Sequence, residues 1–237
     1  MPILNIVFLG LLFIHLSMKL SPDLSPEYTV KKMDAGAWTP DGSGRHPAWQ
    51  QADSLTAFRL YWNEEEPPPT AFKALWTEGY LYFLFEVVDP QRHARIVDNH
   101  KLEVVASDRI ELFFRIDDAM TPYYCLEIDY LGRILDYKAD FYRKMDFEWS
   151  WPAGGIEVAT AVADSGYSVE GRITLASLRS LGLLQGNQLR TGLFRADYTR
   201  AKSGDKTNVR WISWINPGTE KPDFHVPAAF GRLVLVE

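Results

Sequence analysis

Most of the chain after residue 70 consists of short segments in which apolar and polar residues alternate. In Arg109–Ile116 every second residue is apolar, beginning with Ile110, and this period of two predicts a strand with one buried face. Tyr80–Asp89 is apolar on nearly all of both faces, which predicts a long strand buried on both sides. The same patterns predict strands over Ala71–Thr77, Tyr123–Tyr130, Ile134–Tyr137, Ile156–Ala163, Tyr167–Ile173, Leu189–Tyr198, Val209–Ile215 and Gly231–Val236.

Turn-forming residues separate the predicted strands, as at Leu131-Gly132-Arg133 and Asp164-Ser165-Gly166. The one predicted helix is brief, over Leu175–Leu181, with Thr174 as its N-cap. Many short strands separated by turns predict an all-β fold with little helix, in which two antiparallel sheets pack as a β-sandwich of the immunoglobulin or jelly-roll type. The predicted core includes Leu81, Phe83, Phe85, Ile110, Leu112 and Phe114.

The N-terminus carries an apolar run, Ile3–Leu16, which is too short to span a bilayer but has the length of a signal peptide's apolar region. No Lys or Arg precedes the run and no Ala-x-Ala-like site follows it, so a misassigned start codon or a buried N-terminal segment are the alternatives. We predict a signal peptide over residues 1–20, a proline-containing linker over 21–29 and one domain over 30–237. Export to the periplasm or extracellular space follows; otherwise the chain is cytoplasmic.

The composition is that of a globular protein, with 46% hydrophobic and 24% charged residues. The net charge of −6 argues against a domain that binds DNA or other nucleic acid by neutralising phosphates. The lone cysteine, Cys125, excludes an internal disulfide and a cysteine-rich zinc site. The aromatic share of 14% favours strands and stacking on flat ligands.

Motifs occur in a characteristic order along residues 30–237. They are Asp41-Gly42, Trp49, Lys73-Ala74-Leu75-Trp76, Tyr80-Leu81-Tyr82, Val88-Asp89-Pro90, Asp108-Arg109-Ile110-Glu111-Leu112-Phe113, Tyr123-Tyr124, Val169-Glu170, Ile212-Ser213-Trp214 and Phe230-Gly231-Arg232-Leu233. This ordered set resembles carbohydrate-binding module family 9 and its family 9-like relatives. The resemblance implies a β-sandwich that binds sugar as a noncatalytic accessory domain of xylanases and related secreted glycoside hydrolases, in carbohydrate catabolism.

The resemblance also implies a sugar site. Family modules clamp a sugar ring between two tryptophans, and the motif of the second reads Ile212-Ser213-Trp214 here, which makes Trp214 the predicted stacking platform. The family glutamate that accepts hydrogen bonds from sugar hydroxyls corresponds to Glu111, and such charge-assisted bonds are strong. Glu127 stands near the place of a family arginine, and His225 belongs to a family-like turn. Both complete the predicted carbohydrate-binding residues.

The first clamp tryptophan is missing. Lys101–Ser107, where the family has it, contains no aromatic residue, so the implied site grips a sugar ring from one side and binds weakly. Trp211 and Trp214 lie three apart on one predicted strand and therefore face opposite sides. One of them belongs to the core, and the resemblance selects Trp214 as the exposed one.

Structural calcium is common in the family, and the resemblance implies a calcium ion here. Its predicted ligands are Asp89, at the end of a strand, and Asp98, in the following loop, because calcium prefers oxygen ligands from strand ends and loops. The five histidines make no zinc pattern, and no HExxH motif occurs.

We therefore predict a noncatalytic protein that binds an oligosaccharide or the end of a polysaccharide and has no stable transmembrane helix. Two alternatives stay open. A structural or interaction sandwich without sugar binding is one, and a flat face with Trp214 buried would favour it. A glycoside hydrolase is the other, because paired carboxylates perform that chemistry. The in-strand carboxylates are Glu111, Glu127, Asp129 and Glu170.

Overall fold

The computed structural model describes residues 25–33, 36–200 and 207–237. The predicted signal peptide therefore lies outside the described residues. The strands are β1 (Glu27–Lys32), β2 (Thr70–Trp76), β3 (Tyr80–Val88), β4 (Arg109–Arg115), β5 (Tyr123–Asp129), β6 (Ile134–Asp140), β7 (Lys144–Asp146), β8 (Ile156–Ala163), β9 (Gly166–Thr174), β10 (Gln188–Arg200), β11 (Thr207–Ser213) and β12 (Gly231–Val236). The helices are α1 (Leu175–Ser180) and three 3₁₀ turns, η1 (Pro47–Gln51), η2 (Lys101–Ala106) and η3 (Pro227–Ala229).

The twelve described strands hydrogen-bond into one continuous sheet. Its order is β7-β6-β5-β4-β10-β12-β1-β2-β3-β9-β8, with β11 added to β10. Neighbouring strands pair antiparallel except at β1, which is parallel to both β12 and β2. β1 therefore joins two antiparallel halves. One half contains β4, β5, β6 and β10, and the other contains β2, β3, β9 and β8.

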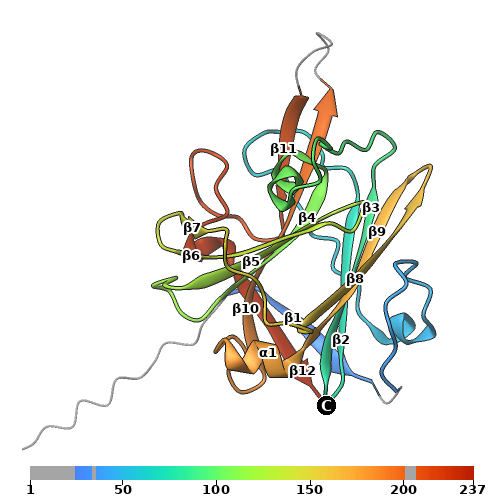
Figure 1. Ribbon diagram of the computed structural model, residues 1–237, viewed down its shortest axis with the longest axis vertical. Coiled ribbons are helices and arrows are strands. Elements are labelled where there is room, and N and C mark those ends of the chain that lie inside the picture. Colours follow the sequence, from blue (N-terminus) through green and yellow to red (C-terminus); the bar gives the residue numbers. More distant parts are fainter. Residues whose placement is uncertain (1–24, 34–35, 201–206) are drawn as a thin grey trace, which may run out of the picture.

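The two halves fold over each other and enclose the main core (Figure 1). Because side chains alternate along a strand, every second residue of β4 and of β3 points into this core. The predicted core residues are all buried in this one cluster: Leu81, Phe83, Phe85, Ile110, Leu112 and Phe114. The predicted all-β sandwich is thus confirmed. It differs from the prediction in that its two layers belong to one continuous sheet, joined through β1.

The predicted helix is also confirmed. The Thr174 hydroxyl accepts a hydrogen bond from the backbone N–H of Ser177 at 3.1 Å, which satisfies one of the free N–H groups at the start of α1. The alternation pattern missed two short strands, β1 and β7. β1 begins at Glu27, inside the predicted linker over residues 21–29.

Candidate functional site

A cavity of about 280 Å³ opens on the outer face of the half-sheet formed by β4, β5, β6 and β10. The alternation that sends Ile110 and Leu112 inward leaves Arg109 and Glu111 on this outer face. The cavity is lined by Val105, Arg109, Glu111, Glu127, Tyr137, Arg143, Met145, Phe147, Trp211, Pro222, Asp223, Phe224 and His225. Predicted site residues Glu111, Glu127 and His225 therefore lie together.

The floor of the cavity is a buried cluster of one guanidinium and two carboxylates. Glu111 on β4 and Glu127 on β5 stand directly opposite each other in the strand register, a placement that repels unless a cation compensates it. Arg109 supplies that cation, with Nη2 2.8 Å from Glu111 Oε1 and Nε 2.7 Å from Glu127 Oε2. The Tyr137 hydroxyl also donates to Glu127 Oε1 at 2.9 Å. The floor is thus rigid and strongly polar.

Burial governs the ionisation of this floor. Glu111 is only 1% exposed, and desolvation raises the pKa of its carboxyl, with Arg109 opposing this effect and the Glu127 carboxylate adding to it. Burial acts on His225 in the opposite direction, because the charged form of histidine is the protonated one, and lowers its pKa to about 3. His225 is therefore neutral near pH 7, and its Nδ1 lies 2.9 Å from the Tyr123 hydroxyl.

Aromatic side chains form one wall of the cavity. Trp211 on β11 is half-buried, and its ring packs edge-on against Phe224 with the ring centroids 5.7 Å apart. The guanidinium carbon of Arg109 lies 5.6 Å from the centre of the Trp211 ring, within the range of a cation–π contact. Met145 and Phe147, from β7 and the residue after it, also line the cavity. An indole face, a charged floor and further apolar side chains thus meet in one concavity.

The rim is held by Asp223. Its carboxylate accepts hydrogen bonds from the backbone N–H of His225 at 2.9 Å and from Arg143 Nη1 at 3.2 Å, and also from the Tyr142 hydroxyl. These contacts join the loop before β12 to the hairpin between β6 and β7. Arg143 is itself still partly exposed at the cavity.

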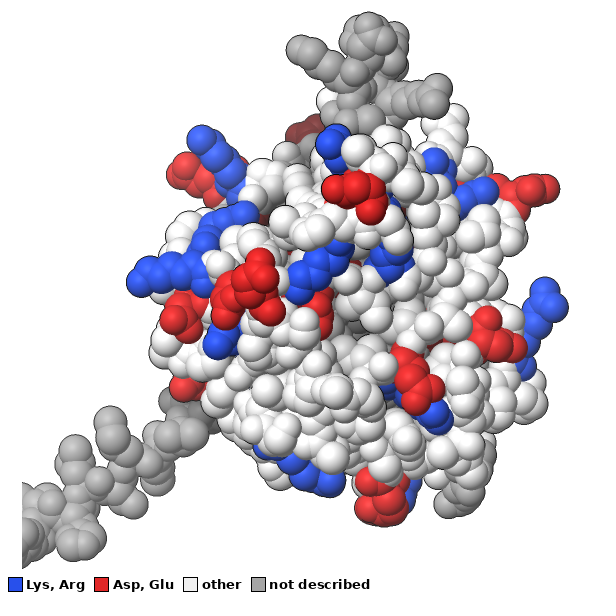
Figure 2. All heavy atoms as spheres, viewed as in Figure 1, with Lys and Arg blue, Asp and Glu red and all other residues white. Residues whose placement is uncertain are grey.

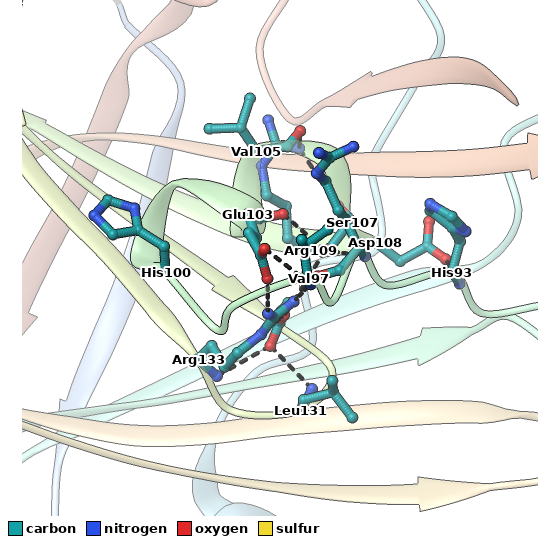
Figure 3. A network of polar contacts seen from close by, with 12 residues as sticks. His93, Val97, His100, Glu103, Val105, Ser107, Asp108, Arg109, Leu131 and Arg133 are labelled. Atoms are coloured by element: carbon teal, nitrogen blue, oxygen red, sulfur yellow. Dashed lines mark hydrogen bonds and ion pairs between the residues drawn. The ribbon is translucent and has the colours of Figure 1, made fainter.

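The segment before Asp108 positions the floor without an aromatic residue. In η2, the Val105 carbonyl accepts a hydrogen bond from Arg109 Nη1 at 2.7 Å. The Arg133 guanidinium lies between Glu103 and Asp129, 3.3 Å from Glu103 Oε2, and so ties η2 to the turn after β5 (Figure 3). A polar network thus occupies the segment before Asp108.

Trp214 does not line this cavity, and the prediction that it is exposed beside Glu111 is wrong. Its side chain is 6% exposed and belongs to the main core. It packs so closely on Gly231 that a Cβ there would lie 2.7 Å from the ring. The two tryptophans do face opposite sides, but Trp211 is the one that reaches the cavity. The sequence pattern of β11 does not identify the inner face, which is set by pairing with β10.

Of the four in-strand carboxylates, only Glu111 and Glu127 line the cavity. Asp129 is bound within the β5–β6 turn by Arg133. Glu170 is buried on the other half-sheet, where it accepts hydrogen bonds from the Trp49 indole at 2.9 Å and the Gly42 backbone N–H at 2.9 Å. Asp129 and Glu170 therefore have structural roles, through their hydrogen bonds and ion pairs.

A second buried polar cluster lies away from the cavity. Asp89 meets Asp108 and Asp197 there, with one oxygen of each within 4.8 Å of the others. Asp98 is exposed, belongs to a loop turn and is not part of this cluster, so its role as a metal ligand stays a prediction. Asp197 of β10 and Asp89, which follows β3, meet because the two halves of the sandwich pack together, and not through sequence proximity.

This cluster offers the oxygen donors that calcium prefers, but it already contains a cation. Arg195 is fully buried, and its Nη2 lies 2.7 Å from Asp197 Oδ1 and 3.3 Å from Asp89 Oδ2. Both carboxylate oxygens of Asp108 accept backbone N–H groups, from His93 and Tyr198. As arranged, these residues do not fit a calcium ion between them. Calcium stays a prediction from the sequence.

Comparisons with known proteins agree with the fold. A family model described as "Carbohydrate family 9 binding domain-like" matches residues 41–237. The chain is 25% identical to "Exoglucanase XynX" of Acetivibrio thermocellus over 188 residues, which is 79% of this chain but 15% of that protein. It is likewise 25% identical to "Endo-1,4-beta-xylanase A" of Thermoanaerobacterium saccharolyticum, with 73% of this chain and 14% of that protein covered. The chain thus corresponds to a small part of each relative.

Solved structures show the same fold at low sequence identity. A candidate carbohydrate-binding protein of Bacteroides uniformis superposes with a TM-score of 0.67 at 20% identity and covers 90% of this chain and 100% of that one. A carbohydrate-binding module of family 9 from Caldicellulosiruptor kristjanssonii, solved with glucose, gives a TM-score of 0.59 at 18% identity over 89% and 96% of the two chains. The same module with cellotriose gives 0.58 at 17% identity over 89% and 93%.

Proposed function

The chain belongs to the carbohydrate family 9 binding domain-like family, and on that premise we propose that it binds a carbohydrate noncovalently in the cavity floored by Arg109, Glu111 and Glu127. The observation that carries this proposal is the joining of an indole wall to a charged floor in one concavity. The apolar face of a pyranose packs on an aromatic ring, while its hydroxyls need strong hydrogen-bond partners. Trp211 provides the first, and the floor residues provide the second.

The ligand is accordingly an oligosaccharide or the end of a polysaccharide. A cavity of about 280 Å³ is small for a long chain to cross, which favours binding at a chain end. The solved family 9 module from Caldicellulosiruptor kristjanssonii was found with glucose and with cellotriose, which supports a pyranose ligand. On the face seen in Figure 2, basic and acidic side chains are intermingled, which gives no support to nucleic acid binding.

The arrangement of carboxylates supports a noncatalytic role. A glycoside hydrolase places its two carboxyl groups on either side of the scissile bond. Glu111 and Glu127 instead lie side by side on neighbouring strands, and both are bound to the same guanidinium. That geometry does not place a general acid and a nucleophile on opposite sides of one bond.

The structural or interaction sandwich is the second candidate. The buried position of Trp214 is the observation that would favour it, but the face beside Glu111 is hollow rather than flat, and Trp211 lines the hollow. Sugar binding is therefore the better supported of the two.

Export is also proposed, from the apolar run near the N-terminus. Among the described residues, no helix is both long enough and apolar enough to cross a membrane. Intact-mass measurement of protein recovered from the native host tests export: a mass that retains Met1, in the cytosolic fraction, would contradict it.

Titration calorimetry against cello- and xylo-oligosaccharides tests the site. We expect binding in the range of about 0.1 mM to several mM, and a loss of about tenfold or more for Trp211→Ala. Trp38→Ala is the matched control, because Trp38 is another half-buried indole and does not line the cavity. Equal affinity of Trp211→Ala and wild type would place the site elsewhere. A broad glycan array with no binding, with and without calcium, would overturn sugar binding.

A further inference from the structure

The charged side chains that line the cavity do not balance. Two of them are cationic and three are carboxylates: Arg109, Arg143, Glu111, Glu127 and Asp223. His225 does not change this count near pH 7, because burial lowers its pKa to about 3. With every carboxyl ionised, the lining therefore carries one uncompensated negative charge.

The imbalance lies at the floor and not at the rim. At the rim, Arg143 and Asp223 form a pair of their own at 3.2 Å. At the floor, the single guanidinium of Arg109 is shared by Glu111 and Glu127, which are 1% and 5% exposed. One guanidinium cannot neutralise two carboxylates, and an uncompensated charge is costly at such burial.

While the cavity is empty, a proton on Glu111 can neutralise the excess negative charge of the floor. The pKa of Glu111 is raised, chiefly by burial, which is the response of a carboxyl group that lacks a full counter-charge. The titratable and charged groups around Glu111 come from every neighbouring element: Arg109, Cys125, Glu127, Tyr137, Arg143 and Tyr198. Among them, only the two arginines are cationic near neutral pH, and Arg143 is paired with Asp223.

We propose that the cavity selects an amino sugar, a pyranose that carries a protonated amine, and that Glu111 is the counter-ion of this ammonium group. This inference rests on the proposed sugar binding and names the ligand class. An ammonium group has three N–H donors and one positive charge, which match the excess acceptors and the excess charge of the floor. Trp211 provides a ring face for the pyranose body, and an indole also attracts a nearby cation.

The same charge count ranks other sugars. A neutral pyranose leaves the floor with its proton on Glu111 and makes ordinary hydrogen bonds. A uronic acid brings a second uncompensated carboxylate beside Glu111 and Glu127, where like charges disfavour binding. The expected order of affinity is amino sugar, then neutral sugar, then uronic acid.

Calorimetric titration of the whole chain with D-glucosamine, D-glucose and D-glucuronic acid at about pH 6.5, where the glucosamine amine is protonated before it binds, tests the order. We expect glucosamine to bind about tenfold more tightly than glucose, the equivalent of one charge-assisted interaction. In Glu111→Gln this preference should shrink to within about twofold. Glu157→Gln is the matched control, since it removes one negative charge from β8, outside the cavity lining, and should keep the preference.

A second measurement applies even if Glu111→Gln does not fold. Glucosamine binding to wild type should release a proton from Glu111, so the measured enthalpy should depend on the buffer's ionisation enthalpy, while glucose binding should not. Glucose binding as tightly as glucosamine, a preference that survives in Glu111→Gln, or no release of a proton would each overturn the amino-sugar inference and leave sugar binding standing. If no sugar of any charge binds, the proposed function falls with it.

Discussion

Replacing the fully buried Arg195 with methionine should strongly destabilise the fold. Its guanidinium joins β10 to the other half of the sandwich, because it pairs with Asp89 at 3.3 Å and donates to the Thr70 hydroxyl at 3.2 Å. It also pairs with Asp197 on its own strand at 2.7 Å. Methionine fills a similar volume without any donor, so the change removes the charge and keeps most of the packing.

The expected loss follows from what is left behind. Removing one partner of a buried ion pair costs about 3–5 kcal/mol, because the remaining charge is buried without compensation. Asp197 keeps Arg210 as a partner, whereas Asp89 loses the guanidinium nearest to it. We therefore expect a loss of about 3–5 kcal/mol in the free energy of unfolding near pH 8.

The loss should shrink in acid. Burial raises the pKa of Asp89 and raises that of Asp108 to about 7, so protons neutralise this cluster as the pH falls. A carboxyl group whose pKa is raised by folding binds its proton more readily in the folded state, and Arg195→Met raises these pKa values further. The stability that Arg195→Met loses at high pH should thus be recovered in part near pH 5.

Urea denaturation followed by tryptophan fluorescence at about pH 8 and pH 5 measures this. Arg210→Met is the matched control, because Arg210 binds the same Asp197 but is partly exposed, and we expect it to lose about 1 kcal/mol or less. A loss below about 1 kcal/mol for Arg195→Met at pH 8, or a loss that does not change with pH, would refute the assignment of Arg195 as the cluster's internal cation.

Three further predictions follow from the core, from Asp108 and from the buried cation. Phe85→Ala should cost about 3–5 kcal/mol in urea denaturation, because Phe85 is fully buried against Phe72; a loss under about 1 kcal/mol would mean that it is not in the core. Asp108 has a pKa of about 7 in the folded state against about 4 in the unfolded state, so it should make wild type lose stability as pH rises from about 4 to 7. His225 has the opposite effect on stability below about pH 6.5, because burial lowers its pKa. The measurement is therefore the difference in stability between wild type and Asp108→Asn, which should lack the Asp108 contribution. Adding EDTA or millimolar calcium should leave the melting temperature of wild type unchanged, because Arg195 already supplies the positive charge in the carboxylate cluster; a large drop with EDTA would show that a bound ion stabilises the fold.

The strands and their core faces could be predicted because alternation is local. A single face of β4 or β3 is apolar over several residues, and nothing distant is needed to identify it. β1 could not be predicted, since its six residues are stabilised by pairing with β12, some 200 positions later. The continuity of the sheet through β1 depends on the same distant pairing.

The floor of the site was half predictable. Glu111 and Arg109 share a strand face by alternation alone, but their meeting with Glu127 needs the register of β4 against β5. The choice between Trp211 and Trp214 depends on how β11 pairs with β10, which the sequence of β11 does not reveal. Asp89 and Asp197 likewise meet only when the two halves of the sandwich pack together, so the sequence did not predict this cluster.

The position of β1 has a consequence for the order in which the chain can fold during synthesis. A ribosome releases β1 about 200 residues before β12, yet β1 hydrogen-bonds along its length to β12 and only through its end to β2. Until β12 emerges from the ribosome, one edge of β1 has no strand beside it. The two halves of the sandwich cannot yet be joined into one sheet through β1. The nascent chain therefore carries an open strand edge while the residues between β1 and β12 are synthesised, and edges of this kind are where unwanted pairing with other chains begins.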